Sequence, residues 1–230
     1  MSNQSQLEGL YPFLHGKPQN PEKLDAALAH SVAEKARDSR ETNERFFGEQ
    51  APILVAAAGA LADVYRNNGQ LFSMGNGGSS CDASHVAVEF VHPVTAGRPA
   101  LAATNLVADL AMISAVGNDL GFDHVFVRQL VAHARKGDAL IGISTSGNSQ
   151  NLIAAFLKAK ELGAVTIGLT GGDGGKMKSS GAVDHCLVVP SMSIHRIQEC
   201  HVATYHILWD LVHTLLADER GSAGRQGGIQ

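Results

Sequence analysis

The sequence has few cysteines and no long apolar run. Its three cysteines, Cys81, Cys186 and Cys200, are odd in number and form no C-x-x-C pair, so neither a disulfide framework nor a thiolate zinc site is expected. No apolar stretch reaches the roughly 18 residues of a membrane span, and the first residues lack the basic and apolar regions of a signal peptide. We therefore expect a cytoplasmic protein without a membrane partner.

An excess of positive charge is also missing. The formal net charge is −4, and no basic patch is visible, so a general attraction to nucleic acid is not expected. The sequence has no G-x-x-x-x-G-K-[ST] motif and no G-x-G-x-x-G after its first predicted strand, which argues against a nucleotide cofactor. Hydrophobic residues make up 44% of the 230 positions, enough for the core of one domain with appendages.

The most informative stretch, from Leu71 to Glu89, predicts a buried strand, a glycine turn and a helix. The turn, Gly75-Asn76-Gly77-Gly78, permits backbone angles and close approaches that a Cβ atom would block. Backbone N–H groups at the start of such a helix attract anions. His85 and Glu89 are four residues apart on that helix, so they project from one face. A solvated surface pair after an ordinary glycine turn is the alternative.

A second polar turn follows the third predicted strand. Ser144, Thr145, Ser146 and Ser149 place four hydroxyls at the start of a helix. Hydroxyls together with free N–H groups suit a phosphate monoester, and the absence of nucleotide motifs favours a phosphorylated sugar over ATP or NAD. A serine-rich helix cap without a ligand is the alternative.

Apolar strands alternate with helices along the chain, which predicts an α/β fold with a five-stranded parallel sheet covered on both faces. The flavodoxin-like, doubly wound order 2-1-3-4-5 places a ligand crevice between strands one and three, and the two polar turns leave those strands. The strands after the first are predicted near residues 100–104, 139–143, 165–169 and 184–190. The predicted divisions are an N-terminal arm and helix in 1–49, a sugar-phosphate-binding domain in 50–217 and a flexible tail in 218–230.

Two helices are predicted ahead of the first strand, after an irregular arm that ends near residue 22. The first covers about 21–47, and the second covers about 52–67 and ends at Asn67-Asn68-Gly69. A small sheet cannot cover two such helices. Part of their apolar surface is therefore expected either at an oligomer contact or in the core of one subunit.

The last predicted helix, over about 194–217, carries a polar row. Gln198 and His206 are eight residues apart, about two turns, on one helix face. With His85 and Glu89 they would offer two imidazoles, a carboxylate and an amide oxygen, a plausible set for a divalent transition metal such as zinc. The nearby alternatives, expected at the surface or behind the ligands, are His195, Glu199 and His201.

Five motifs, taken in order, resemble the SIS (sugar isomerase) fold, and most closely the phosphoheptose isomerase family. The likeness runs from about residue 50 to 217, with a helical extension before it. The motifs are Gly75-Asn76-Gly77-Gly78-Ser79, His85-x-x-x-Glu89, Gly117-Asn118-Asp119-x-Gly121-Phe122, Ile143-Ser144-Thr145-Ser146-Gly147-Asn148-Ser149 and Arg196-Ile197-Gln198-Glu199.

The resemblance implies a homotetramer with active sites at subunit contacts. It also implies an aldose–ketose isomerase that converts sedoheptulose 7-phosphate to D-glycero-D-manno-heptose 7-phosphate through an enediolate. In that reading Glu89 and His206 are the catalytic acid/base pair, and zinc is held by His85, Glu89, Gln198 and His206. The residues assigned to the substrate are Asn76, Gly77, Gly78, Glu89, Asn118, Asp119, Ser144, Thr145, Ser146, Ser149 and Gln198.

Two positions depart from the family pattern. A Thr-Gly-Arg segment usually follows the glutamate, where this chain has Phe90-Val91-His92-Pro93 and its next arginine is Arg98. His195 stands where the family has an aspartate. These changes keep an isomerase for a different sugar phosphate as one alternative. A non-catalytic SIS regulator or assembly factor is the other, and the presence of both Glu89 and His206 argues against it.

Overall fold

The computed structural model describes residues 21–226. Residues 1–20, which hold nearly all of the irregular arm predicted to end near residue 22, and the last tail residues, 227–230, lie outside this part. The chain divides into two compact units, Met1–Arg40 and Glu41–Gln230. The described part of the first unit is helical throughout, and the second unit contains the sheet.

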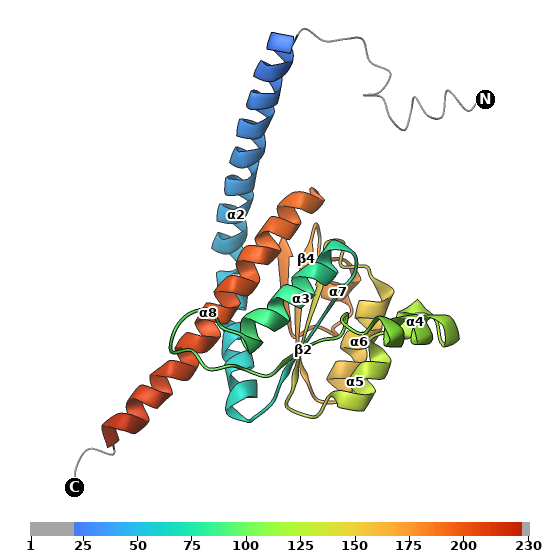
Figure 1. Ribbon diagram of the computed structural model, residues 1–230, viewed down its shortest axis with the longest axis vertical. Helices are drawn as coiled ribbons and strands as arrows, with labels where there is room; N and C mark the ends of the chain where they lie inside the picture. Colours follow the sequence, from blue (N-terminus) through green and yellow to red (C-terminus); the bar gives the residue numbers. More distant parts are fainter. Residues whose placement is uncertain (1–20, 227–230) are drawn as a thin grey trace. The chain divides into compact units, whose positions relative to one another are not determined.

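Five strands form one parallel sheet in the order β2-β1-β3-β4-β5 (Figure 1). The predicted doubly wound arrangement is therefore confirmed. Because the direction of winding reverses between β1 and β3, the turns that leave these two strands flank the crevice expected at this point of the fold. The strands are β1 (Leu71–Gly75), β2 (Ala103–Asn105), β3 (Ala139–Ser144), β4 (Val165–Gly171) and β5 (His185–Val189).

Helices cover both faces of the sheet, and buried side chains form a separate core on each face. Leu71 of β1 belongs to the core shared with α2, α3 and α8, whereas its neighbour Phe72 belongs to the core shared with α4, α5, α6 and α7. Successive strand residues thus serve opposite layers. The helices are α2 (Pro21–Arg66), α3 (Gly78–Val91), α4 (Leu110–Asp119), the 3₁₀ turn η2 (Phe122–His124), α5 (Val127–His133), α6 (Gln150–Glu161), α7 (Gly175–Ser179) and α8 (Ile194–Gln226).

The residues predicted as two N-terminal helices form one continuous helix, α2, with Pro52 inside it. Proline cannot donate to the carbonyl of Gly48, and an internal proline costs a helix about 3 kcal/mol. Phe46 and Leu54 are both buried in the core of the second unit, so the apolar stripe continues across the proline. Burial of two such side chains contributes about 3–6 kcal/mol, which offsets that cost.

Smaller differences concern the start of α4, the end of α8 and one short helix. The sequence predicts a helix over about 107–116, whereas α4 begins at Leu110, because the Asp109 carboxylate accepts a hydrogen bond from the backbone N–H of Met112 at 2.9 Å and caps the helix. Helix α8 continues to Gln226, past its predicted end at 217. The short helix α7 was not predicted. Within residues 21–226, no helix combines the length and the apolar character that a membrane crossing requires.

Candidate functional site

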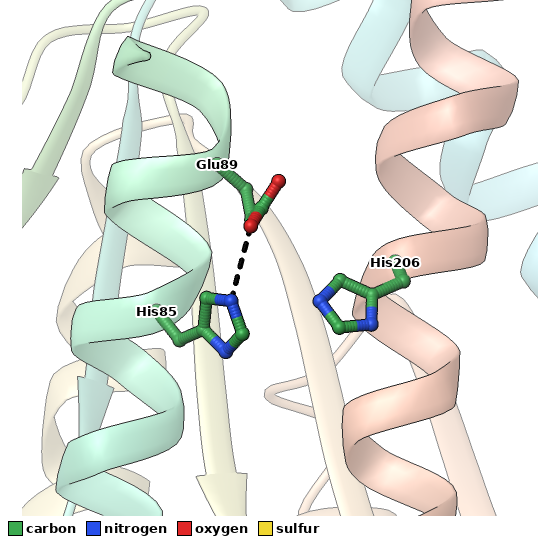
Figure 2. A group of neighbouring side chains, drawn as sticks. All are labelled: His85, Glu89 and His206. Atoms are coloured by element: carbon green, nitrogen blue, oxygen red, sulfur yellow. Dashed lines mark hydrogen bonds and ion pairs between the residues drawn. The ribbon is translucent and has the colours of Figure 1, made fainter. Parts of the chain in front are cut away.

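His85 and Glu89 project from α3 toward His206 on α8, and the three side chains meet between the two helices (Figure 2). Nε2 of His85 lies 3.0 Å from Oε1 of Glu89, and the two imidazole rings have centroids 5.0 Å apart. One donor atom from each residue lies within 4.8 Å of the other two. All three are half-buried, so a small molecule or ion can reach them.

The cluster forms because α3 and α8 run side by side in the same direction. The Tyr205 hydroxyl contacts His85, and the Trp209 indole donates to the backbone oxygen of Glu89 at 2.8 Å. In both pairs the residue on α8 comes 120 positions after its partner. The start of α3 keeps this register, because a Cβ atom added at Gly78 would lie only 2.5 Å from the side-chain nitrogen of Gln198.

The donor set fits a divalent transition metal. Two imidazole nitrogens and one carboxylate oxygen are ligands that zinc accepts, and catalytic zinc sites commonly use three protein ligands and leave one position open. Gln198 lies about 12 Å before His206 along the axis of α8, with its amide against Gly78. Ligation by Gln198 therefore stays a prediction.

Two residues that the sequence analysis passed over lie directly behind His85. The Tyr205 hydroxyl is 2.9 Å from Nδ1 of His85, and it also forms a hydrogen bond with the carboxyl group of Asp82. Tyr205 and Asp82 are only 2% and 9% exposed. The signal was present in the sequence, since Asp82 precedes His85 by three residues and so shares its helix face.

Burial controls the protonation of these two groups. It raises the pKa of Tyr205 far above its ordinary value, and the negative charges of Asp82 and Glu89 raise that pKa further. Burial also raises the pKa of Asp82, while the charge of His85 and the hydrogen bond from Tyr205 lower it. The phenol therefore keeps its proton across the physiological range.

The two polar turns meet, as their places after β1 and β3 predict. Asn76 and Asn151 join them through two reciprocal amide hydrogen bonds, each of 2.9 Å. Ser149 is the N-cap residue of α6, but its side chain makes no capping hydrogen bond. Its hydroxyl instead lies 3.0 Å from the hydroxyl of Ser144. The turn after β3 is thus held in place by groups on both sides of it.

A cavity of about 390 Å³ opens beside the turn after β3. This volume is within the range of small-ligand sites. Its described lining comes from three segments and does not include His85, Glu89 or His206, so the cavity and the cluster share no residue. The lining residues are Thr145, Ser146, Asn148, Gly171, Gly172, Asp173, Ser191, Met192, Ile194 and Ile197.

Asn118 and Asp119 lie at the end of α4 and are exposed. The Asn118 amide donates to the Asp119 carboxylate at 2.8 Å, and in the described part of the chain neither residue lines the cavity or belongs to the cluster. Their predicted contact with the sugar stays a prediction.

The three alternative residues on α8 have different surroundings. His195 is exposed, and Glu199 pairs with Arg196 at 2.7 Å. His201 belongs to the core, contrary to its expected place, because it is 0% exposed and its Nε2 lies 3.2 Å from the carbonyl oxygen of Thr170. Burial lowers the pKa of His201 to about 4, so its imidazole is neutral at pH 7.

Arg98, the arginine that follows the unusual Phe90-Val91-His92-Pro93 segment, lies against α8. Its guanidinium carbon is 4.3 Å from the centre of the Trp209 ring, and it forms an ion pair with Asp210. Trp209 in turn donates a hydrogen bond to the backbone oxygen of Glu89. Arg98 therefore helps to position Glu89 through Trp209.

Comparisons with known proteins agree with this architecture. The SIS domain family matches residues 36–171. A phosphoheptose isomerase from Desulfovibrio desulfuricans is 44% identical over 193 residues, which cover 84% of this chain and 88% of that protein.

Two solved structures are also similar. The phosphoheptose isomerase from Neisseria gonorrhoeae has a TM-score of 0.76 and 38% identity, covering 81% of this chain and 99% of its own. That from Francisella tularensis has a TM-score of 0.77 and 32% identity, covering 81% and 98%. With the parallel sheet, the two joined turns and the cluster between α3 and α8, these likenesses show that the chain belongs to the phosphoheptose isomerase family of SIS domain proteins and is a sugar-phosphate isomerase.

Proposed function

We propose that the protein converts sedoheptulose 7-phosphate to D-glycero-D-manno-heptose 7-phosphate. The names of its relatives, phosphoheptose isomerases, support a seven-carbon substrate. The observation that carries the proposal is the approach of Glu89 and His206 from two different helices to within 4.8 Å. A carboxylate and an imidazole so placed are the groups that a proton transfer between adjacent sugar carbons requires.

The reaction moves a carbonyl group from C2 to C1 without an external oxidant or reductant. Glu89 removes a proton from C1, the electrons form the enediolate, and a proton is returned to C2. Since Oε1 of Glu89 faces His85, we assign the proton transfer at carbon to Oε2. His206 opens the sugar ring and moves protons between the sugar oxygens.

The two polar turns bind the remainder of the substrate in this proposal. The hydroxyls and backbone N–H groups of the turn after β3 hold the phosphate, and the side chains around the turn after β1 line the sugar. The phosphate group is assigned to Ser144, Thr145, Ser146 and Ser149, and the sugar to Asn76, Gly77, Gly78, Gln198, Asn118 and Asp119.

We also propose a zinc ion held by His85, Glu89, Gln198 and His206. When bound, such an ion supplies Lewis-acid stabilisation of a developing oxyanion. The half-buried donor set between α3 and α8 supports this assignment. A carboxylate that binds a metal through one oxygen is a weaker base at the other oxygen, so the two tasks proposed for Glu89 compete.

We infer a cytoplasmic homotetramer in which Asn118 and Asp119 reach the sugar bound by a neighbouring subunit. Their exposure at the end of α4 supports this. Leu24, Leu28 and Val32 are exposed at four-residue spacing on α2, which provides an apolar stripe for subunit contact. Light scattering after size-exclusion chromatography measures the assembly, and a monomer at micromolar concentration would contradict it.

The test of the reaction is turnover of sedoheptulose 7-phosphate by the wild type and by Glu89→Gln. The variant keeps the size of the side chain and loses the base, so we expect turnover to fall by about 10²–10⁴-fold. Glu161→Gln is the matched control, because Glu161 forms an exposed ion pair with Lys158 at the end of α6. Full activity of Glu89→Gln, or no turnover by the wild type, would refute the proposal.

A second candidate is an isomerase for a different sugar phosphate. The observation that favours it is His195, which is exposed on α8 beside the cavity-lining Ile194 and replaces a carboxylate of the family pattern. A panel of ketose phosphates of five to seven carbons, compared by kcat/KM, separates the two candidates. A higher value for another sugar would favour the second.

A further inference from the structure

We propose that Tyr205, held in place by Asp82, is a positioning residue that fixes the orientation of His85 and directs its Nε2 toward Glu89 and His206. This inference deepens the proposed metal site and rests on it. The inference concerns the Tyr205 side chain, which contacts the proposed ligand His85 on the side away from Glu89. No step of the isomerisation depends on it.

The first argument is the direction of the hydrogen bonds. A phenol has one proton to donate, while an ionised carboxylate can only accept. The Tyr205 hydroxyl donates its hydrogen bond to the Asp82 carboxylate. The phenol oxygen therefore accepts a hydrogen bond from its other neighbour, Nδ1 of His85, at 2.9 Å. His85 then carries its own proton on Nδ1.

The second argument is what this arrangement does to the other ring nitrogen. A neutral imidazole protonated at Nδ1 has its lone pair at Nε2, and Nε2 lies 3.0 Å from Oε1 of Glu89. With this tautomer both atoms present lone pairs, so one cation can be bound by both. The hydrogen bond from His85 to Tyr205 thus prepares the side of the ring that faces Glu89 for a cation, as groups behind metal-binding histidines commonly do.

The third argument is that the effect of the Tyr205 hydroxyl can be tested apart from the packing of its ring. The Tyr205 ring packs edge-on against His85 and His206, with centroid distances of 5.2 and 4.8 Å. Phenylalanine would keep both contacts and the buried volume. Tyr205→Phe therefore tests the hydrogen bond alone.

The experiment measures zinc and cobalt affinity of the full chain by competition with a chromophoric chelator. We expect Tyr205→Phe to bind either ion about 10–100-fold more weakly than the wild type, with a changed cobalt absorption spectrum. Tyr65→Phe is the matched control, since the Tyr65 hydroxyl donates to the backbone oxygen of Ala102 at 3.3 Å. It should leave affinity and spectrum unchanged.

Asp82→Asn provides a second measurement should Tyr205→Phe fold poorly. It removes the charge and keeps an oxygen that can accept from Tyr205, so we expect a smaller loss of affinity. Because the two residues act in series, the double variant should lose no more than Tyr205→Phe alone.

Three results would overturn the positioning role: unchanged affinity in both Tyr205→Phe and Asp82→Asn, an equal loss in Tyr65→Phe, or a wild type that binds neither ion. The proposed reaction is judged separately by turnover. A wild type that binds zinc but does not isomerise sedoheptulose 7-phosphate would refute the substrate and leave the positioning role intact, provided that Tyr205→Phe weakens binding as expected.

Discussion

The buried imidazole of His201 makes the stability of this protein depend on pH. Its side chain is 0% exposed, and its Nε2 forms a hydrogen bond with the carbonyl oxygen of Thr170 on β4. Burial lowers its pKa to about 4, from an ordinary value of 6.5. The unfolded chain therefore takes up a proton near pH 6.5, whereas the folded chain resists protonation until about pH 4. Folding loses stability as the pH falls through this window, and His201 has no such effect above it.

The size of the effect follows from the shift. A difference of one pKa unit corresponds to about 1.4 kcal/mol, so the interval from 6.5 to 4 sets an upper limit of about 3 kcal/mol. At pH 4.5, where the folded imidazole is still largely neutral, the loss is about 2–3 kcal/mol. Since a whole domain is stable by about 5–15 kcal/mol, this single group is expected to remove a measurable share of the unfolding free energy at acidic pH.

The assay is urea unfolding of the wild type and His201→Leu at pH 7.5, 6.0 and 4.5, at one protein concentration. The variant loses the bond to Thr170, which shifts its stability at every pH. The informative quantity is the fall in unfolding free energy between pH 7.5 and 4.5, which should be about 2–3 kcal/mol smaller in His201→Leu. His195→Gln, which removes an exposed histidine from the same helix, should retain the wild-type fall. Identical pH profiles for the wild type and His201→Leu would refute the reasoning.

Two further predictions concern the turns that flank the site. A Cβ atom added at Gly75 would lie 2.2 Å from the backbone oxygen of Ser79, so Gly75→Ala should lower the unfolding free energy by at least about 2 kcal/mol. Both variants are compared with the wild type by thermal melting. Gly59→Ala, at a helical position with nothing within 4 Å of the added atom, should be neutral or stabilising. Asn151→Asp removes the amide that donates to Asn76, and we expect a loss of about 1–3 kcal/mol by urea unfolding. Stability equal to the wild type in either Gly75→Ala or Asn151→Asp would contradict the close packing of these turns.

Local patterns were sufficient to predict the sheet and the candidate residues of the cluster. Apolar runs and glycine or serine turns are read within a few residues, and they specify where a parallel strand ends and a helix begins. The spacing of His85 and Glu89 is likewise a property of one helix. These features were predictable because the physics that produces them acts within one element.

Features that depend on contacts between distant elements were harder to predict. Pro52 signals a helix end in isolation, but the burial of Phe46 and Leu54 on either side carries α2 through it. Tyr205 was overlooked because its importance comes from a neighbour 120 positions away. His201 was expected at the surface or behind the ligands, and only the packing of α8 against β4 shows that it is in the core.

The shared register of α3 and α8 sets a limit on how this chain can change in length. Each residue added to or removed from an α-helix turns everything beyond it by about 100°, so a single insertion between Gln198 and His206 would carry the histidine round to another side of its helix. A substitution between α3 and α8 changes one contact. An insertion or deletion in α8 moves every later residue of the helix away from its partner on α3. Variation in length among related chains should therefore be concentrated in the connections, such as the segment around Arg98, and be nearly absent from the first half of the last helix.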